Sequence, residues 1–224
     1  MDGAEIEGVL AAAEQAVEAG SGLAGIGFWR VVSEVKRDAS LVEAYADRIA
    51  AIDRKAFEAW ALVTVPAVVG TAVMGAATIA GLGLVWWAYA ASPPWNGLLL
   101  LAGMGVTLVT THGLAHLVSA RFGGMAVTHW FIGTYRRPQP GVKVDYGGYL
   151  RAPARTRAWM HASGAIVTKL IPFLAVPPAL VMDAPAWTVV VLAVLGVGQI
   201  VTDVLWSTKA SDWKKFRREM AFVK

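Results

Sequence analysis

The sequence predicts an all-α membrane protein with four transmembrane helices, and two observations carry that prediction. Hydrophobic residues make up 56% of the 224 residues and charged residues only 16%, whereas soluble domains are about one-quarter charged. Several uncharged stretches also exceed the roughly 20 apolar residues that one helical crossing of a bilayer needs. We therefore expect a multi-pass integral membrane protein.

The apolar stretches define the expected domains. They lie at about 59–91, 97–120, 159–181 and 186–206. The first is long for a single crossing. A polar loop at 121–158, with short alternating segments resembling a β-hairpin, separates the second stretch from the third. We expect N-terminal cytoplasmic amphipathic helices (1–58), a four-span membrane domain (59–206) and a basic amphipathic tail (207–224).

Hydrophobic spacing supports two helices in the N-terminal region. The first ends at Gly20-Ser21-Gly22, and the second begins near Ser40, where Ser40-Leu41-Val42-Glu43 matches a capping box. The tail is expected to lie on anionic lipid. Binding a partner or covering a functional site is the alternative role for the tail.

The basic residues predict the orientation. They are Arg30, Lys36, Arg37, Arg48, Arg54 and Lys55 in the N-terminal region, Arg121, Arg136, Arg137, Lys143, Arg151, Arg155 and Arg157 in the loop, and Lys209, Lys214, Lys215, Arg217, Arg218 and Lys224 in the tail. The two short turns between spans contain none. Four crossings put all three basic segments on one side, which the positive-inside rule identifies as the cytoplasm. We expect a plasma (inner) membrane protein with both termini cytoplasmic. We attribute the net charge of +4 to the cytoplasmic basic segments and not to nucleic-acid binding.

The absence of cysteine limits the chemistry. It excludes disulfides, thiolate zinc sites and thiol nucleophiles. The N-terminus is acidic and lacks a basic n-region, so we expect no cleavable signal peptide. A metal site for a borderline-soft divalent ion would then use imidazole and carboxylate ligands.

Three side chains suggest such a site. His112 and His116 lie four residues apart on the second span and so share one helical face. Asp203 lies at a similar depth on the fourth span. Two imidazoles and a carboxylate make a three-ligand zinc set, with water in the fourth position. Alternatively, the histidines only cap the helix C-terminus, and Asp203 pairs with Lys169, Lys209 or a histidine.

The sequence after the first histidine is informative. The stretch from His112 to Gly124 (HGLAHLVSARFGG) resembles the site-2 protease family of intramembrane zinc metalloproteases, whose pattern is HExxH followed by a small residue, Arg and Gly. Residues 125–133 look like the family's β segment, and 144–149 (VDYGGY) like its Gly-Gly-Tyr element. The resemblance covers roughly residues 97–210.

The resemblance implies a function for these residues. It makes His112, His116 and Asp203 zinc ligands in an enzyme that hydrolyses a peptide bond of a membrane-embedded protein substrate. The segments at 125–133 and 142–149 would be edge strands to which an extended substrate adds. Substrate-binding residues would then include Gly147, Gly148 and Tyr149.

One departure from the family pattern concerns catalysis. The glutamate that serves as general base is replaced by Gly113, and general acid–base help accelerates reactions roughly 100- to 10,000-fold. His161, His129 and Asp145 are candidate substitutes. The alternatives to a zinc metallopeptidase are a catalytically inactive pseudoprotease that binds metal and regulates a partner helix, and a structural membrane subunit.

Overall fold

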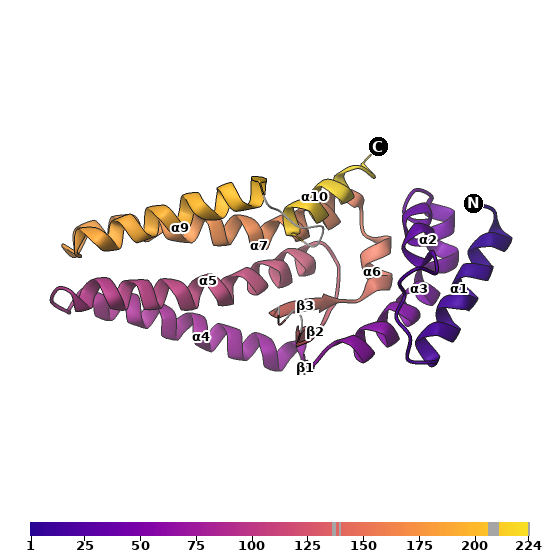
Figure 1. Cartoon of the computed structure of the whole chain (residues 1–224), viewed down its shortest axis with the longest axis horizontal. Coiled ribbons are helices and arrows are strands. Elements are labelled where there is room, and N and C mark those ends of the chain that lie inside the picture. Colours follow the sequence, from indigo (N-terminus) through magenta and orange to yellow (C-terminus); the bar gives the residue numbers. More distant parts are fainter. Residues whose placement is uncertain (136–137, 139, 206–210, 224) are drawn as a thin grey trace. The chain divides into compact units, whose positions relative to one another are not determined.

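The structure is a computed structural model (Figure 1), and it describes residues 1–135, 138, 140–205 and 211–223. Four of the basic residues that predict the orientation lie outside the described residues, namely Arg136, Arg137, Lys209 and Lys224. The elements are α1 (Gly3–Glu18), α2 (Phe28–Val35), α3 (Ala39–Trp60), β1 (Val63–Pro66), α4 (Ala67–Ala88), α5 (Trp95–Phe122), β2 (Val127–Ile132), β3 (Pro140–Val144), α6 (Tyr146–Arg151), α7 (Ala154–Leu174), α8 (Val176–Val181), α9 (Ala186–Leu205) and α10 (Asp212–Met220).

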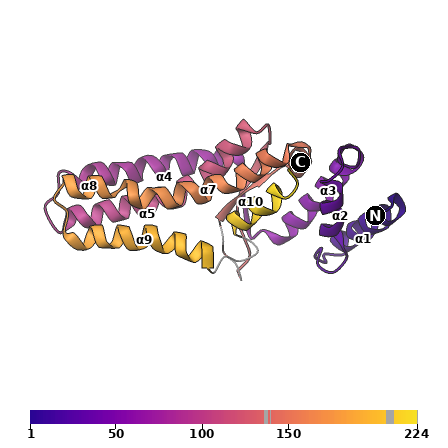
Figure 2. The ribbon, with the colours of Figure 1, turned by 90° about the horizontal axis from the view of Figure 1, so that it is seen from above.

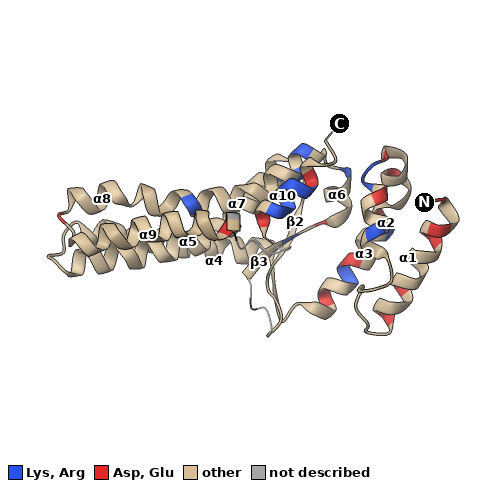
Figure 3. Cartoon of the chain, turned by 45° about the horizontal axis from the view of Figure 1, so that its top comes forward, with Lys and Arg blue, Asp and Glu red and all other residues tan. Residues whose placement is uncertain are grey.

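The predicted fold class is confirmed. Four helical segments are long and apolar enough to cross a membrane, namely Ala67–Ala88, Trp95–Phe122, Ala154–Val181 and Ala186–Asp203. Large apolar side chains on α4 are exposed, including Ile79 at 72% and Trp86 at 81%, as expected of a lipid-facing surface. In Figure 3, colour for charge is scarce on α4, α5, α8 and α9 and dense on α10. The chain is therefore a multi-pass helical membrane protein.

The chain folds as two compact units, which differ from the three expected segments. Unit 1 contains residues 1–67, 120–157 and 222–224, and unit 2 contains residues 68–119 and 158–221. The loop between the second and third spans thus folds with the N-terminal region. The tail helix α10 folds with the spans instead of forming a domain of its own.

Unit 1 has a small apolar core made by its helices. Ile6, Leu10, Phe28, Val31 and Ile49 of α1, α2 and α3 are buried there. The helix expected from Ser40 is α3, and its N-cap is Asp38, whose carboxylate accepts from the Ser40 backbone N–H at 2.8 Å. A buried ion pair between Asp53 and Lys143 joins α3 to β3.

A three-stranded antiparallel sheet, in the order β1-β2-β3, changes the expected first span. Val63 of β1 pairs with Ile132 of β2, and Ile132 also pairs with Pro140 of β3. The stretch at 59–91 is therefore the end of α3, a β-strand and then the span α4. Because β2 is paired on both sides, it is not the edge strand that was expected at 125–133.

The Gly-Gly-Tyr element is helical, not extended. Gly147, Gly148 and Tyr149 lie in α6, whose N-cap is Asp145; its carboxylate accepts from the Gly148 backbone N–H at 2.7 Å. Tyr149 is only 3% exposed, and its ring stacks on that of Tyr146 at 5.3 Å. These contacts give the element a packing role within unit 1.

In unit 2 the long helices run side by side, as Figures 1 and 2 both show. Glycine allows α4 and α5 to approach closely, because a Cβ on Gly103 would lie 2.5 Å from the Gly81 carbonyl oxygen. Leu100 of α5 and Leu192 of α9 are buried in the apolar core of this unit. The bundle provides the fixed helices on which the candidate site is built.

Candidate metal centre

The first two members of the site are histidines on α5. His112 and His116 stand one turn apart, and their imidazole rings meet edge to face with centroids 4.7 Å apart. Their Nε2 atoms are 3.3 Å apart. His116 is 8% exposed as a residue, whereas the side chain of His112 is 36% exposed. The pair therefore has one buried member and one that is reachable from outside.

Helix α7 orients the buried imidazole. The Nδ1 of His116 lies 2.7 Å from the Met160 carbonyl oxygen. Because a carbonyl only accepts, Nδ1 must carry the hydrogen, and a neutral His116 keeps its lone pair on Nε2. Such a hydrogen bond to the second ring nitrogen is typical of metal-binding histidines.

Gly164 of α7 makes room for this ring. A Cβ at this position would lie 2.8 Å from Cε1 of His116 and 2.9 Å from Cδ2, and closer still to Nε2. Any side chain here would therefore collide with the imidazole. The glycine is needed for the close approach of α7 to α5 rather than for a special backbone conformation.

The third member comes from the tail. Ser211 caps α10 by accepting from the Lys214 backbone N–H at 3.3 Å, and Asp212 is the first residue of the helix. Asp212 Oδ2 lies 3.3 Å from His112 Nε2 and 3.2 Å from His116 Nε2. Its other oxygen, Oδ1, accepts from Lys215 Nζ at 3.0 Å. Lys215 thereby holds the carboxylate with Oδ2 towards the imidazoles.

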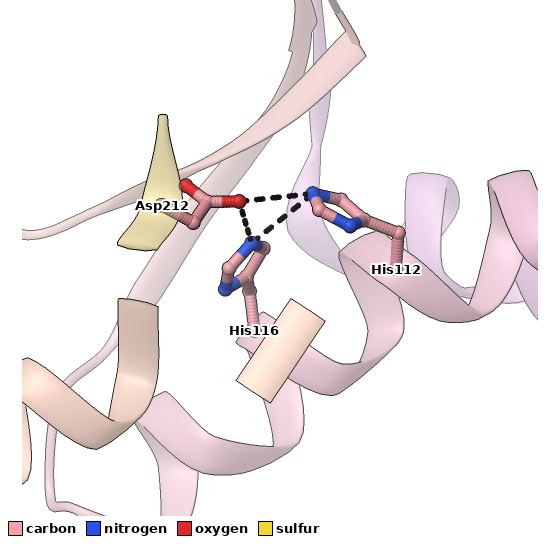
Figure 4. Close-up of side chains that lie close together, drawn as sticks. All are labelled: His112, His116 and Asp212. Carbon is pink, nitrogen blue, oxygen red and sulfur yellow. Dashed lines mark hydrogen bonds and ion pairs between the residues drawn. The ribbon is translucent and has the colours of Figure 1, made fainter. Parts of the chain in front are cut away.

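The three donor atoms converge on one point, as Figure 4 shows. His112 Nε2, His116 Nε2 and Asp212 Oδ2 are 3.2–3.3 Å apart in every pair. In a tetrahedral zinc site with bonds of about 2.0–2.1 Å, ligand atoms lie about 3.3–3.4 Å apart. The atoms thus match one face of such a tetrahedron. Within the described parts of the chain, this is the one group of three or more histidine or acidic residues close enough to share an ion.

The charges also suit a cation. Burial raises the pKa of Asp212, but the hydrogen bond from His112 and the charge of Lys215 lower it, and the pKa of this carboxyl is held well below its usual range. Asp212 is therefore ionised. If both imidazoles are neutral, the three converging atoms carry at most one hydrogen between them, on His112 Nε2. A divalent cation could accept the lone pairs of all three atoms.

Asp203, the expected third ligand, has a different partner. Its carboxylate pairs with Lys169 Nζ between α9 and α7, and Lys169 also donates to the Ala165 carbonyl oxygen at 3.3 Å. This is the ion pair that the sequence offered as the alternative. The structure therefore brings together two of the three expected ligands and replaces Asp203 with Asp212. The physical reason is that Lys169 of α7 neutralises the charge of the Asp203 carboxylate directly.

The three candidate substitute bases fall in different units. His161 on α7 belongs to unit 2, within electrostatic reach of Asp212 and His116. His129 and Asp145 belong to unit 1, where both line a pocket of about 500 Å³. Asp145 also serves as the α6 cap. Of the three, only His161 shares a unit with the donor cluster.

Sequence reasoning missed Asp212, Lys215 and Gly164, although one signal was present. Asp212, Phe216 and Glu219 recur at i, i+4 and i+7 in a tail that is otherwise basic, and this spacing places them on one helical face. An acidic residue on the apolar face of a basic helix predicts an inward-pointing group. Glu219 is fully buried, as that pattern indicates.

The chain was also compared with known proteins. No protein family, no curated protein and no solved structure matches it. The resemblance to site-2 proteases therefore depends on the motif around His112, and the assignment of a function depends on the geometry of the donor cluster.

Proposed function

We propose that this chain is a site-2-protease-like membrane metallopeptidase that binds zinc through His112, His116 and Asp212. The observation that carries the proposal is the convergence of three donor atoms 3.2–3.3 Å apart. Imidazole and carboxylate ligands without thiolate suit a borderline-soft divalent ion such as zinc. When bound by three protein ligands, zinc supplies an open coordination position and a Lewis acid that polarises a peptide carbonyl.

The surrounding residues have distinct roles in this proposal. Met160 fixes the tautomer of His116 through its carbonyl oxygen, and Lys215 orients Asp212. The partly exposed His112 leaves one side of the cluster accessible. Because the cluster belongs to the same unit as the spanning helices, the proposed substrates are membrane-embedded proteins.

His161 is the proposed proton acceptor, in place of the glutamate that the site-2 protease pattern has where this chain has Gly113. It lies on α7, one residue after Met160, whose carbonyl accepts from His116. It interacts electrostatically with both His116 and Asp212. A neutral imidazole has one ring nitrogen with a free lone pair, which can accept a proton.

A non-catalytic, metal-binding regulator is the second candidate function. Two observations favour it: Gly113 has no side chain with which to accept a proton, and the tail helix α10 lies against the cluster through Asp212. In this role the zinc site would hold a partner helix or the tail in place without cleaving it.

Zinc binding is the first test. We expect purified protein to retain one zinc ion per chain, and we expect His112→Ala and His116→Ala to lose it. His129→Ala, a histidine of unit 1, is the matched control and should retain zinc. Metal content is measured by elemental analysis after dialysis, with circular dichroism to confirm that each variant is folded. Equal zinc content in wild type and both ligand variants would remove the proposed site.

Cleavage separates the two candidate functions. Labelled casein in detergent is a general probe, and we expect zinc-loaded wild type to cleave it slowly and Gly113→Glu to cleave it about 100-fold or more faster. His161→Ala should abolish wild-type cleavage while keeping zinc. If zinc-loaded wild type and Gly113→Glu are both inactive, the regulator is the better description.

A further inference from the structure

Helix α10 sorts its charges onto two faces. Glu219 is fully buried, and Asp212 contacts the two imidazoles, so neither acidic residue belongs to the exposed surface of the helix. Lys214, Arg217 and Arg218 are all exposed. The outward surface of α10 is therefore purely cationic, and we call these three residues the basic face.

The chain geometry places the basic face near a bilayer. Helix α9 ends at Leu205 and α10 begins at Asp212, and seven residues span at most about 25 Å. Asp212 also contacts α5, which is itself long and apolar enough to span the membrane. Helix α10 is thus held directly against a spanning helix rather than on a long tether.

Aromatic residues beside the basic face also suit the membrane interface. The ring of Phe216 stacks on Trp213 at 5.1 Å and meets Trp159 of α7 edge-on at 5.4 Å. Trp159 remains 48% exposed. Tryptophan is enriched at the level of the lipid headgroups, and a juxtamembrane cation gains about fivefold in affinity for an anionic surface.

We infer that the basic face of α10, formed by Lys214, Arg217 and Arg218, docks anionic phospholipid headgroups and that this docking strengthens metal binding at Asp212. The inference rests on the proposed metal site. Headgroup and metal would bind opposite faces of the same nine-residue helix, so they do not compete for space. Each restrains α10 in its docked position, and two ligands that favour one ordered state bind with positive cooperativity.

The experiment compares nanodiscs of phosphatidylcholine alone with nanodiscs that also contain phosphatidylglycerol. The triple variant Lys214→Gln, Arg217→Gln, Arg218→Gln removes the basic face. The triple variant Arg30→Gln, Arg37→Gln, Lys55→Gln changes the net charge equally on exposed residues of unit 1 and is the matched control. Zinc affinity is measured by chelator competition, and lipid binding by the immobilised fraction of spin-labelled phosphatidylglycerol.

We expect wild type and the control to bind zinc about fivefold or more tightly in anionic discs than in neutral discs, and the basic-face variant to lose most of this ratio. Surface accumulation of zinc on anionic lipid is common to all three proteins and cancels in the comparison. Immobilised phosphatidylglycerol should fall only in the basic-face variant.

Equal zinc ratios and equal lipid immobilisation in all three proteins would overturn the inference. A zinc affinity that rises with poly-glutamate but not with phosphatidylglycerol would assign the basic face to an acidic protein segment instead, and would also overturn it. If no protein binds zinc in either disc, the proposed function fails, whereas loss of lipid immobilisation in the basic-face variant would still support the docking surface.

Discussion

Two carboxylates of unit 2 have opposite surroundings. Asp203 is paired with Lys169, so its charge is neutralised by a neighbouring helix. Asp212 directs one oxygen to Lys215 and the other to two imidazole nitrogens. The ion pair of Asp203 with Lys169 balances one negative charge with one positive charge. In the cluster at Asp212, three atoms with lone pairs share at most one hydrogen when the imidazoles are neutral.

This difference separates a structural polar pair from a candidate site. A charge within a span is costly and must be neutralised, and Lys169 does this for Asp203. The cluster at His112 has more lone pairs than hydrogens, which is the condition that a bound cation relieves. The comparison predicts that changes to the cluster alter metal affinity and that changes to the ion pair alter stability.

The largest expected effect is that of Asp212→Asn. Loss of the charged ligand should weaken zinc binding about 100-fold or more, because loss of an outer-shell partner alone costs roughly 10- to 100-fold. Chelator competition measures the affinity. Asp203→Asn is the matched control, and its zinc affinity should stay within about threefold of wild type. If Asp203→Asn weakened zinc binding more than Asp212→Asn, Asp203 would be the better candidate for the ligand, and the contrast drawn between the two carboxylates would be wrong.

The pairing of His112 and His116 was predicted from the sequence, and the carboxylate that joins them was not. The four-residue spacing of His112 and His116 fixes their relative placement on any helix. The third position depends on which helix contacts α5, and that is long-range packing. Asp203 was chosen by depth in the membrane, but depth does not show that Lys169 stands beside it.

The same limit applies to unit 1. The four spans followed from hydropathy, but the stretch at 59–91 hid β1, because Val63, Thr64 and Val65 are as apolar on average as a span. Their β-branched side chains favour a strand, and pairing with β2 decides the outcome. Gly147 and Gly148 were expected in an extended segment, yet the cap from Asp145 stabilises a helix there.

A change at Gly164 tests the geometry of the cluster without touching a ligand. Gly164→Ala puts a methyl group against the His116 ring, so the imidazole must turn away, and we expect zinc affinity to fall about 10- to 100-fold. Gly198→Ala on α9 is the matched control, because a Cβ there meets nothing within 4 Å, and it should bind zinc normally. Unchanged affinity in Gly164→Ala would mean that His116 does not bind the metal in this rotamer.

A smaller effect is expected from Lys215→Gln. Glutamine can still donate a hydrogen bond to Asp212 Oδ1, so the carboxylate keeps its orientation but loses a neighbouring charge. We expect zinc affinity to change by less than about tenfold, below the usual loss for an outer-shell partner. Lys215→Ala, which removes the donor as well, should bind zinc more weakly than Lys215→Gln. Equal affinities would mean that Lys215 does not orient the carboxylate.

The smallest effect on zinc is expected at the ion pair. Lys169→Met leaves Asp203 without its partner, and we expect bundle stability to fall by about 2 kcal/mol, less than the 3–5 kcal/mol of a fully buried pair, because both side chains are about one-quarter exposed. Thermal unfolding in detergent measures the loss. Lys169→Met combined with Asp203→Leu should recover most of the stability, because no uncompensated charge remains. Zinc affinity should match wild type in both variants, and a loss of zinc in Lys169→Met alone would show that the pair supports the metal centre.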